Sequence, residues 1–273
     1  MARQPFDHVR TAIRGGGDLG SGVAYRLCRA GFPVLIAEIA HPLLVRRAVA
    51  YGSAAVEGAI TVGGITARRV ETIPDALAAQ SQGEIAVIVD PEGLTLPEYD
   101  PAVLIDARML KTDPGPHPVE PLLVIGLGPG FIAPDNCDVV IETNRGHNLG
   151  RVIEQGAPEP NTGSPGGVLG RTRDRVLRAP VEGVVSGLEP IGATLRAGQP
   201  VARVADQTVA APFDGVLRGL VHDGLHVPAG MKIGDVDPRA APEYCFTISE
   251  KALAIGGGAL EAILASPAIR ERL

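Results

Sequence analysis

A glycine-rich turn near the start of the sequence carries the residue types that hold a phosphate. Gly15, Gly17 and Gly20 form a Gly-x-Gly-x-x-Gly pattern, and the next apolar run ends in Glu38. Glycines permit a tight turn and a close backbone approach, a helix N-terminus offers N–H groups, and the acid can bind a ribose diol. A nucleotide or dinucleotide site is therefore expected, although a glycine-rich turn that only packs closely has the same pattern. Its expected residues are Gly15, Gly16, Gly17, Asp18, Gly20 and Glu38.

The densest polar cluster in the sequence follows the strand-like run 139–141. Strand ends are where α/β proteins place their chemistry. Arg145 can bind a carboxylate or a phosphate, and His147 can transfer a proton near neutral pH. Glu142 or Asn144 can orient either side chain. The alternative for this cluster is a solvated loop with a capping asparagine.

Two further loops follow strand-like runs and are expected to face the same crevice. The first contains Asp106, Arg108 and Lys111, and Lys111 is noticeable because lysine otherwise occurs only at positions 232 and 251. A surface ion pair is the alternative for Lys111. The second loop is a glycine-rich turn of a kind that lines ligand crevices, with a rigid loop as its alternative. The candidates in these loops are Asp106, Lys111, Gly126, Gly128 and Gly130.

The elements that position these residues alternate between strands and helices. A strand is expected over 11–13, and Val23, Leu27 and Ala30 recur at helical spacing after the glycine turn. Asp18 is unfavourable beside a phosphate, so we expect it to cap this helix or to hold a metal or a ligand hydroxyl. Further expected elements are strands at 34–37, 85–89, 103–105 and 122–125 and a helix at 75–80. The pattern predicts a doubly wound, Rossmann-like parallel sheet.

The composition excludes several classes of protein. A chain of 273 residues can bury a sizeable core without disulfides or metals. Its formal net charge of -6 provides no basic field for a nucleic acid or an anionic membrane surface. The three cysteines show no CxxC spacing, which argues against a disulfide framework and a zinc site. Without a signal peptide or a membrane-spanning run, a cytoplasmic protein with no metal site is expected.

An internal repeat lies in the last third of the sequence. Residues 179–204 align without gaps on 211–236, and each copy opens with Ala-Pro-x-x-Gly-x-Val. The repeat resembles the barrel-sandwich fold of biotinyl and lipoyl carrier domains, whose modified lysine sits on the hairpin between the two halves. The matching residues, 205–208, contain no lysine, so the resemblance implies no covalent biotin or lipoate. We expect this module to serve in packing, dimerisation into a homo-oligomer, or docking.

The expected organisation has three parts. A Rossmann-like domain over 1–170 ends in the Gly/Pro-rich stretch 161–170, which predicts a hinge or boundary. The barrel-sandwich module occupies 171–238. An amphipathic C-terminal helix within 239–273 is expected to pack back on the first domain.

Four segments together resemble the selenium-dependent molybdenum hydroxylase system protein family. They are Arg-Gly-Gly-Gly-Asp-Leu from Arg14, Ile-Gly-Leu-Gly-Pro-Gly-Phe from Ile125, Glu-Thr-Asn-Arg-Gly-His-Asn-Leu-Gly-Arg-Val from Glu142, and Lys-Ile-Gly-Asp-Val-Asp-Pro-Arg from Lys232. The resemblance implies an accessory role in maturing or supplying molybdenum hydroxylases, with such a hydroxylase as partner. The expected ligand is a nucleotide, such as NAD, or the nucleotide-bearing part of a molybdenum cofactor. An NAD-dependent oxidoreductase and a non-catalytic scaffold that docks a partner through the β-module are the alternatives.

Overall fold

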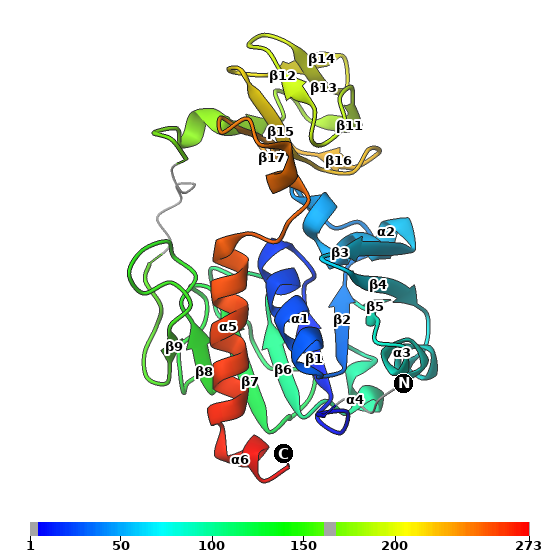
Figure 1. Cartoon of the computed structure of the whole chain (residues 1–273), viewed down its shortest axis with the longest axis vertical. Coiled ribbons are helices and arrows are strands. Elements are labelled where there is room, and N and C mark those ends of the chain that lie inside the picture. The colour runs from blue at the N-terminus through cyan, green and yellow to red at the C-terminus, as the bar shows by residue number, and fades with distance from the viewer. Residues whose placement is uncertain (1–4, 161–167, 273) are drawn as a thin grey trace. The chain divides into compact units, whose positions relative to one another are not determined.

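The computed structural model describes residues 5–160 and 168–272, which fall into two compact units (Figure 1). The first unit comprises Met1–Pro42, Tyr51–Asn161 and Ile248–Leu273. The second comprises Leu43–Ala50 and Thr162–Thr247. The short segment Leu43–Ala50 thus belongs with the β-rich part of the chain, although it lies more than a hundred residues before it. Most of the predicted hinge, residues 161–167, lies outside the described residues.

The first unit is built on a 9-stranded, mostly parallel sheet with the order β3-β4-β5-β2-β1-β6-β7-β8-β9. Only the edge strands β3 and β9 run antiparallel to their neighbours. The predicted α/β class is therefore confirmed at the level of a large, mostly parallel sheet with further antiparallel sheets. The strands are β1 (Thr11–Arg14), β2 (Val34–Glu38), β3 (Ala59–Val62), β4 (Ile65–Val70), β5 (Ile85–Val89), β6 (Val103–Asp106), β7 (Leu123–Leu127), β8 (Val139–Ile141) and β9 (Val152–Ile153).

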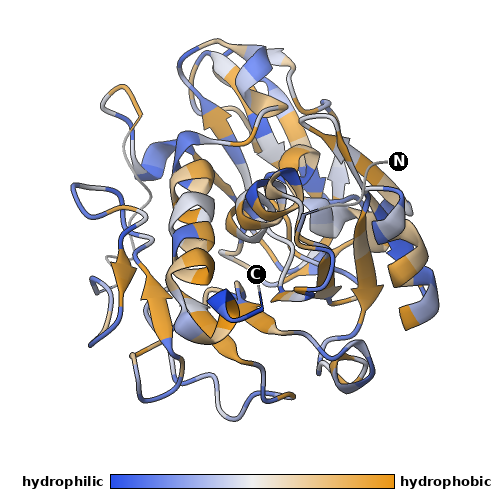
Figure 2. Ribbon diagram, turned by 60° about the horizontal axis from the view of Figure 1, so that its bottom comes forward, coloured by the Kyte–Doolittle hydropathy of each residue, from blue (hydrophilic) through white to orange (hydrophobic). Residues whose placement is uncertain are grey.

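The central strands form because each is a continuous apolar run that is buried on both faces. Their hydrophobic character is visible along most of their length in Figure 2. The sequence did not predict the hairpin of β3 and β4, because these strands include exposed polar residues at a sheet edge. Its turn consists of Gly63 and Gly64, both with positive φ.

Helices cover both faces of this sheet. Helices α1 (Asp18–Ala30) and α5 (Glu250–Ala265) lie side by side (Figure 1). Helix α1 ends at Gly31, whose φ of 96° is the left-handed value that stops a helix. Helices α3 (Ile73–Ser81) and α4 (Leu96–Tyr99) contribute to the core on the sheet face that includes Ala12 and Leu35. The remaining short helices are α2 (Ala54–Glu57), α6 (Pro267–Arg270) and the 3-10 turns η1 (Arg47–Val49), η2 (Tyr51–Ser53), η3 (Arg173–Arg175) and η4 (Pro242–Cys245).

The second unit contains two 4-stranded antiparallel sheets with the orders β10-β17-β15-β12 and β14-β13-β11-β16. No closed barrel is formed by the described residues. The inner faces of the two sheets form one hydrophobic cluster, which includes Val185, Val201, Leu217 and Val236. The strands are β10 (Val176–Arg178), β11 (Gly183–Gly187), β12 (Thr194–Leu195), β13 (Pro200–Val204), β14 (Gln207–Ala210), β15 (Gly215–Leu220), β16 (His226–Val227) and β17 (Lys232–Asp237).

The internal repeat corresponds to this arrangement of strands. The first copy supplies β11, β12 and β13, and the second supplies β15, β16 and β17. Each sheet takes its two longer repeat strands from one copy and its short strand from the other. The copies therefore exchange strands, and neither could bury its apolar face alone. The hairpin between β13 and β14 turns at Ala205, which has a φ of 49°, and Asp206.

Among the described residues, no helix combines the length and apolar character needed to cross a membrane.

Candidate functional site

The glycine-rich turn is tied to the end of β2 by backbone hydrogen bonds to a buried acid. The Gly16 amide donates to Glu38 Oε2 at 2.7 Å, and the Ile39 amide donates to Glu38 Oε1 at 2.8 Å. The Gly15 amide donates to the carbonyl of Ala37 at 2.9 Å. Two of the amides that we expected to hold a phosphate, those of Gly15 and Gly16, are therefore used within the fold. These glycines shape the turn, and the donors for a ligand must lie further along it.

A short segment of η2 covers the Gly16 peptide. The Gly52 amide donates to the Gly16 carbonyl at 2.9 Å, and the Ser21 hydroxyl donates to the same oxygen at 2.9 Å. The Tyr51 amide in turn donates to the Ser21 hydroxyl at 2.8 Å. A Cβ atom on Gly16 would lie 2.7 Å from the backbone of Gly52, so only glycine fits here. This packing could not be predicted from the sequence, because η2 has no recognisable motif.

The N-terminus of α1 retains hydrogen-bond donors. Its N-cap is Gly17, which has no side chain to cap the helix. The amides of Gly17, Leu19 and Gly20 make no hydrogen bond within the described part of the chain. The prediction that Asp18 caps the helix was wrong, because Asp18 is the first helical residue and not the residue before it. Gly20 permits close packing, since a Cβ atom there would lie 2.2 Å from the carbonyl oxygen of Gly15.

Glu38 is 8% exposed at the carboxyl end of β2. Burial raises the pKa of its carboxyl group, and the hydrogen bonds from Ile39 and Gly16 act in the opposite direction. Each carboxylate oxygen can accept more than one hydrogen bond, so Glu38 can still accept from a ligand hydroxyl. Glu38 thus supports the turn and remains a candidate for binding a ribose.

The loop after β8 is held in place by Glu142, which is 2% exposed. Its Oε1 accepts from the Asn144 amide at 2.6 Å, and its Oε2 accepts from the Glu159 amide at 2.7 Å. Glu159 also accepts from the side-chain amides of Asn144 at 2.6 Å and Asn148 at 3.1 Å. Glu142 and Asn144 therefore order the loop itself and do not orient Arg145 or His147 by a direct hydrogen bond.

The two most reactive candidates of this loop lie at its surface. Arg145 forms an ion pair with Glu250 in the first turn of α5, with an N–O distance of 2.5 Å. Both side chains are exposed, so the pair itself contributes little stability. His147 is exposed and makes no hydrogen bond or ion pair with the described residues.

Lys251 is one of the three lysines in the sequence, and no site was expected at this position. It is partly buried in the first turn of α5. Burial lowers the pKa of its ammonium group, and the positive charge of Arg145 lowers it further. The charges of Asp18 and Glu142 oppose this shift. Helix α5 packs against α1. Only the rarity of lysine in the sequence could have drawn attention to Lys251.

Of the candidates at the end of β6, Asp106 and Arg108 bind each other. The Asp106 side chain is fully buried, and its carboxylate accepts from Arg108 Nε at 2.9 Å and Nη2 at 2.5 Å. Asp106 thus anchors Arg108. Lys111 is exposed and pairs with no described residue.

The turn of Gly126, Gly128 and Gly130 packs against the loop that follows β6. The Gly130 amide donates to the Leu110 carbonyl at 2.9 Å, and a Cβ atom on Gly130 would lie 2.3 Å from the carbonyl oxygen of Thr112. A Cβ atom on Gly126 would lie 2.3 Å from the ring of Phe131. Gly128 has a φ of 103°. Gly126 and Gly130 thus permit close internal packing, and Gly128 supplies a left-handed backbone turn.

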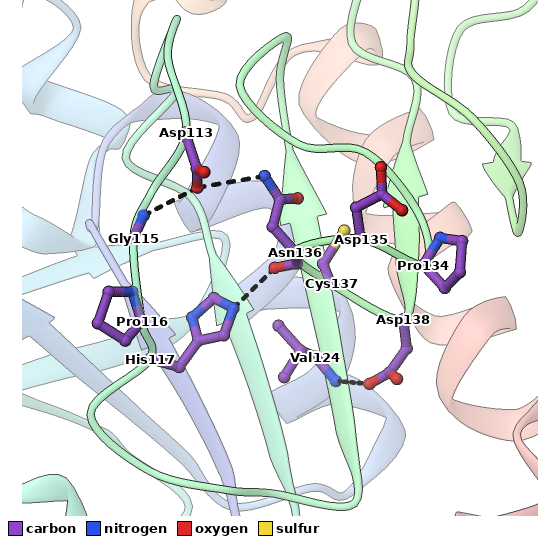
Figure 3. A pocket seen from close by; sticks show the side chains of 10 residues that line it. All are labelled: Asp113, Gly115, Pro116, His117, Val124, Pro134, Asp135, Asn136, Cys137 and Asp138. Carbon is purple, nitrogen blue, oxygen red and sulfur yellow. Dashed lines mark hydrogen bonds between the residues drawn. The ribbon is translucent and has the colours of Figure 1, made fainter.

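A separate hollow of about 530 Å³ lies between the loops 113–117 and 134–138 (Figure 3). His117 shares a hydrogen bond with the Asn136 carbonyl at 2.9 Å, and Asp138 accepts from the Val124 amide at 2.6 Å. Asp113 accepts from the Gly115 amide at 3.0 Å. These polar groups connect the loops to each other and to β7. No group of three or more metal-ligating side chains occurs among the residues that the structure describes.

Comparison with known proteins gives one close relative by sequence. No family model matches the chain. The uncharacterized protein YqeB of Escherichia coli (strain K12) is 42% identical over 260 residues, which are 95% of this chain and 48% of that protein. The chain thus spans about half the length of the curated relative that it matches.

Two solved structures show a weak likeness. The first is the ectoine utilization protein EutE (DoeB) from Ruegeria pomeroyi, with 12% identity, 83% of this chain and 56% of that chain covered, and a TM-score of 0.23. The second is a succinylglutamatedesuccinylase/aspartoacylase from Rhodobacter sphaeroides, with 13% identity, 85% and 86% covered, and a TM-score of 0.28. Neither score is high enough to indicate a shared fold.

Proposed function

We propose that this chain is an accessory protein for molybdenum hydroxylases that binds a nucleotide, or the nucleotide-bearing part of a molybdenum cofactor, at the glycine-rich turn. The observation that carries the proposal is the uncapped N-terminus of α1. The amides of Gly17, Leu19 and Gly20 have no partner in the described chain, and a helix N-terminus attracts an anion. Glu38 ends the adjacent strand, where it can accept from a ribose. These residues fit a phosphate with an attached sugar.

The strand order supports a Rossmann-type site. Read along the chain, β1, β2, β5, β6, β7 and β8 lie in the order β5-β2-β1-β6-β7-β8. With β3, β4 and β9 left out, these six strands match the 3-2-1-4-5-6 order of dinucleotide-binding sheets, and β4 adds a further parallel strand beside β5. The order reverses between β1 and β6, and ligands of such sheets bind at the carboxyl end of this point. The glycine turn directly follows β1.

The link to molybdenum hydroxylases rests on the sequence resemblance of the four segments described above. In this proposal the β-module of the second unit is a barrel-sandwich without an attachment lysine, and it docks a partner. Its exposed apolar residues include Val184, which is 50% exposed, and Leu188, which is 45% exposed. The alternative function is a scaffold that binds no nucleotide, and a binding experiment can reject it.

Gly17→Val is expected to abolish nucleotide binding without unfolding the protein. Gly17 has a φ of -68° and a ψ of -173°, which is extended backbone that a β-branched residue adopts readily. The added side chain would stand where the ligand must approach the α1 amides. Binding is measured by thermal shift against NAD, NADP, ATP, CTP, GTP and free molybdopterin. A ligand at about a hundred times its Kd should add roughly 2.7 kcal/mol to the free energy of unfolding.

Gly64→Ala is a suitable control for Gly17→Val, because no atom lies within 4 Å of the added Cβ in the β3–β4 turn. Its positive φ will cost stability but should leave the ligand-induced shift unchanged. Absence of a shift with every ligand would overturn the proposal in favour of the scaffold. A shift with NAD together with oxidation of reduced nicotinamide would favour the oxidoreductase.

The double variant Arg145→Ala, His147→Ala is expected to weaken ligand affinity while leaving stability nearly unchanged. Arg145 and His147 are both exposed, and loss of the exposed pair with Glu250 should cost no more than about 1 kcal/mol. Titration calorimetry with the ligand found in the screen measures the affinity. Unchanged affinity, together with unchanged activation of a hydroxylase, would remove Arg145 and His147 from the site.

A further inference from the structure

A buried arginine at the carboxyl end of β1 has no paired carboxylate within 5–160 and 168–272, the described part of the chain. Arg14 is 6% exposed, and its guanidinium makes one hydrogen bond, from Nη2 to the carbonyl oxygen of Pro91 at 3.1 Å. No carboxylate of the described chain lies within ion-pairing distance of it. A buried cation without a paired anion is strongly unfavourable in a protein interior. Folding alone therefore gives no reason to keep an arginine at this position.

The neighbouring carboxylates are already engaged. Asp106 is the register partner of Arg14 on the adjacent strand β6, but both of its oxygens accept from Arg108. Both oxygens of Asp90 accept from the backbone and hydroxyl groups of the loop 93–95. Glu92 is exposed and forms no ion pair with Arg14. The guanidinium of Arg14 consequently keeps nitrogens that no described residue binds.

A second arginine stands beside the first. Arg108 is held by Asp106 through Nε and Nη2, which leaves Nη1 available. The backbones also approach closely, since a Cβ atom on Gly15 would lie 3.3 Å from the Arg108 amide nitrogen. Burial lowers the pKa of Arg14, and the charge of Arg108 lowers it further. Two like charges brought together at one strand end are stabilised by an anion between them.

We propose that Arg14 and Arg108 form a binding site for an oxyanion, namely the carboxylate or phosphate group of a small ligand. The site lies where the strand order reverses between β1 and β6, at the carboxyl edge of the sheet. Arg14 shares a sheet face with Ala12, which packs in the core of α3 and α4. Arg14 thus lies on the other side of β1 from Ile13 and provides donors separate from the α1 amides. The oxyanion site depends on the side chains of Arg14 and Arg108 and not on nucleotide binding at the turn.

The test uses the full chain and two probes, inorganic phosphate and succinate, at ionic strength matched with sodium chloride. At least one probe is expected to raise the Tm and to bind measurably by titration calorimetry. Arg14→Met should reduce this affinity by about tenfold or more, because it removes charge-assisted hydrogen bonds. Arg14→Lys, which keeps the charge but loses the planar fork, should retain part of the affinity. Arg203→Met, which removes an exposed arginine of β13, should leave it unchanged.

The Tm of Arg14→Met without ligand provides a second, independent readout. An arginine kept for a ligand costs stability in its absence, so the variant should melt at the same temperature as the wild type or higher. A fall of several degrees would mean that Arg14 is structural and would overturn the inference. Equal Tm values for the wild type in phosphate, succinate and chloride would also overturn it. A response to phosphate alone identifies a phosphate group, and a response to succinate alone identifies a carboxylate.

Discussion

Gly258→Ala is expected to destabilise the protein by about 3 kcal/mol or more, whereas the neighbouring Gly257→Ala should stabilise it. A Cβ atom on Gly258 would lie 2.1 Å from the Gly150 carbonyl oxygen and 3.1 Å from Ile141. Backbone on the facing loop cannot move as a side-chain end can, so α5 would have to shift. Gly257 meets nothing within 4 Å, and there alanine should add about 0.5–1 kcal/mol by its better helix propensity.

Chemical denaturation of the two variants measures both free energies of unfolding. Gly256→Ala serves as a third member of the series, since its Cβ would lie 2.5 Å from the Gly22 carbonyl oxygen of α1. It should destabilise like Gly258→Ala. Effects of the same sign at 257 and 258 would contradict this account of the α5 contacts.

The glycine contacts of α5 also matter for the candidate site. They set how closely α5 approaches α1 and the loop after β8, and the first turn of α5 carries Glu250 and Lys251. Gly258→Ala should therefore weaken ligand binding even at temperatures where the variant is folded. Gly257→Ala should leave binding unchanged.

Asp237→Ala is expected to lower the free energy of unfolding by about 3–5 kcal/mol, because it leaves a buried cation unpaired. Asp237 is 1% exposed and accepts from Arg218 Nη1 at 3.1 Å and from Arg239 Nη2 at 2.6 Å. The Arg218 side chain is itself 8% exposed, so water cannot replace the lost carboxylate. Asp206→Asn is the matched control, since this exposed turn residue should change stability by less than about 0.5 kcal/mol.

The same carboxylate predicts an acid-dependent loss of stability. Burial alone would raise the pKa of Asp237, but hydrogen bonds from Arg239 and the charge of Arg218 outweigh it and lower the pKa to about 2. A group with a lowered folded-state pKa stabilises the fold above its unfolded value, here 3.8, and loses this contribution as the pH falls towards 2. The contribution is roughly 2–3 kcal/mol. A constant difference in stability between wild type and Asp237→Ala from pH 6 to pH 2 would contradict this.

Much of the architecture could be predicted from local patterns. The continuous apolar runs predicted β2, β5, β7 and β8 to within a few residues, because burial on both faces leaves no polar interruption. The internal repeat was read from the sequence, and its two copies do supply matching strands of the second unit. The edge hairpin of β3 and β4 and the assignment of Leu43–Ala50 to the second unit had no local signal.

The candidate site was predicted less completely, because a side chain's role depends on partners that lie far away in the sequence. Glu142 was expected to orient Arg145 or His147, but its carboxylate accepts hydrogen bonds from the amides of Asn144 and Glu159. The carboxylate of Asp106 likewise accepts a hydrogen bond from the side chain of Arg108. Arg14 belongs to a sequence motif, but nothing in the sequence reveals that it is buried without a carboxylate partner in the described part of the chain.

The sequence by itself determined the alternation of strands and helices, the glycine turn after β1 and the repeat, since these follow from the chemistry of neighbouring residues. Only the tertiary structure decided which polar groups are consumed inside the fold and which remain for a ligand. The Gly16 amide donates to Glu38, whereas the amides of Gly17 and Leu19 have no partner among the residues that the structure describes. The physical reason is that a hydrogen bond or ion pair requires atoms within about 3 Å, and long-range packing alone brings such atoms together.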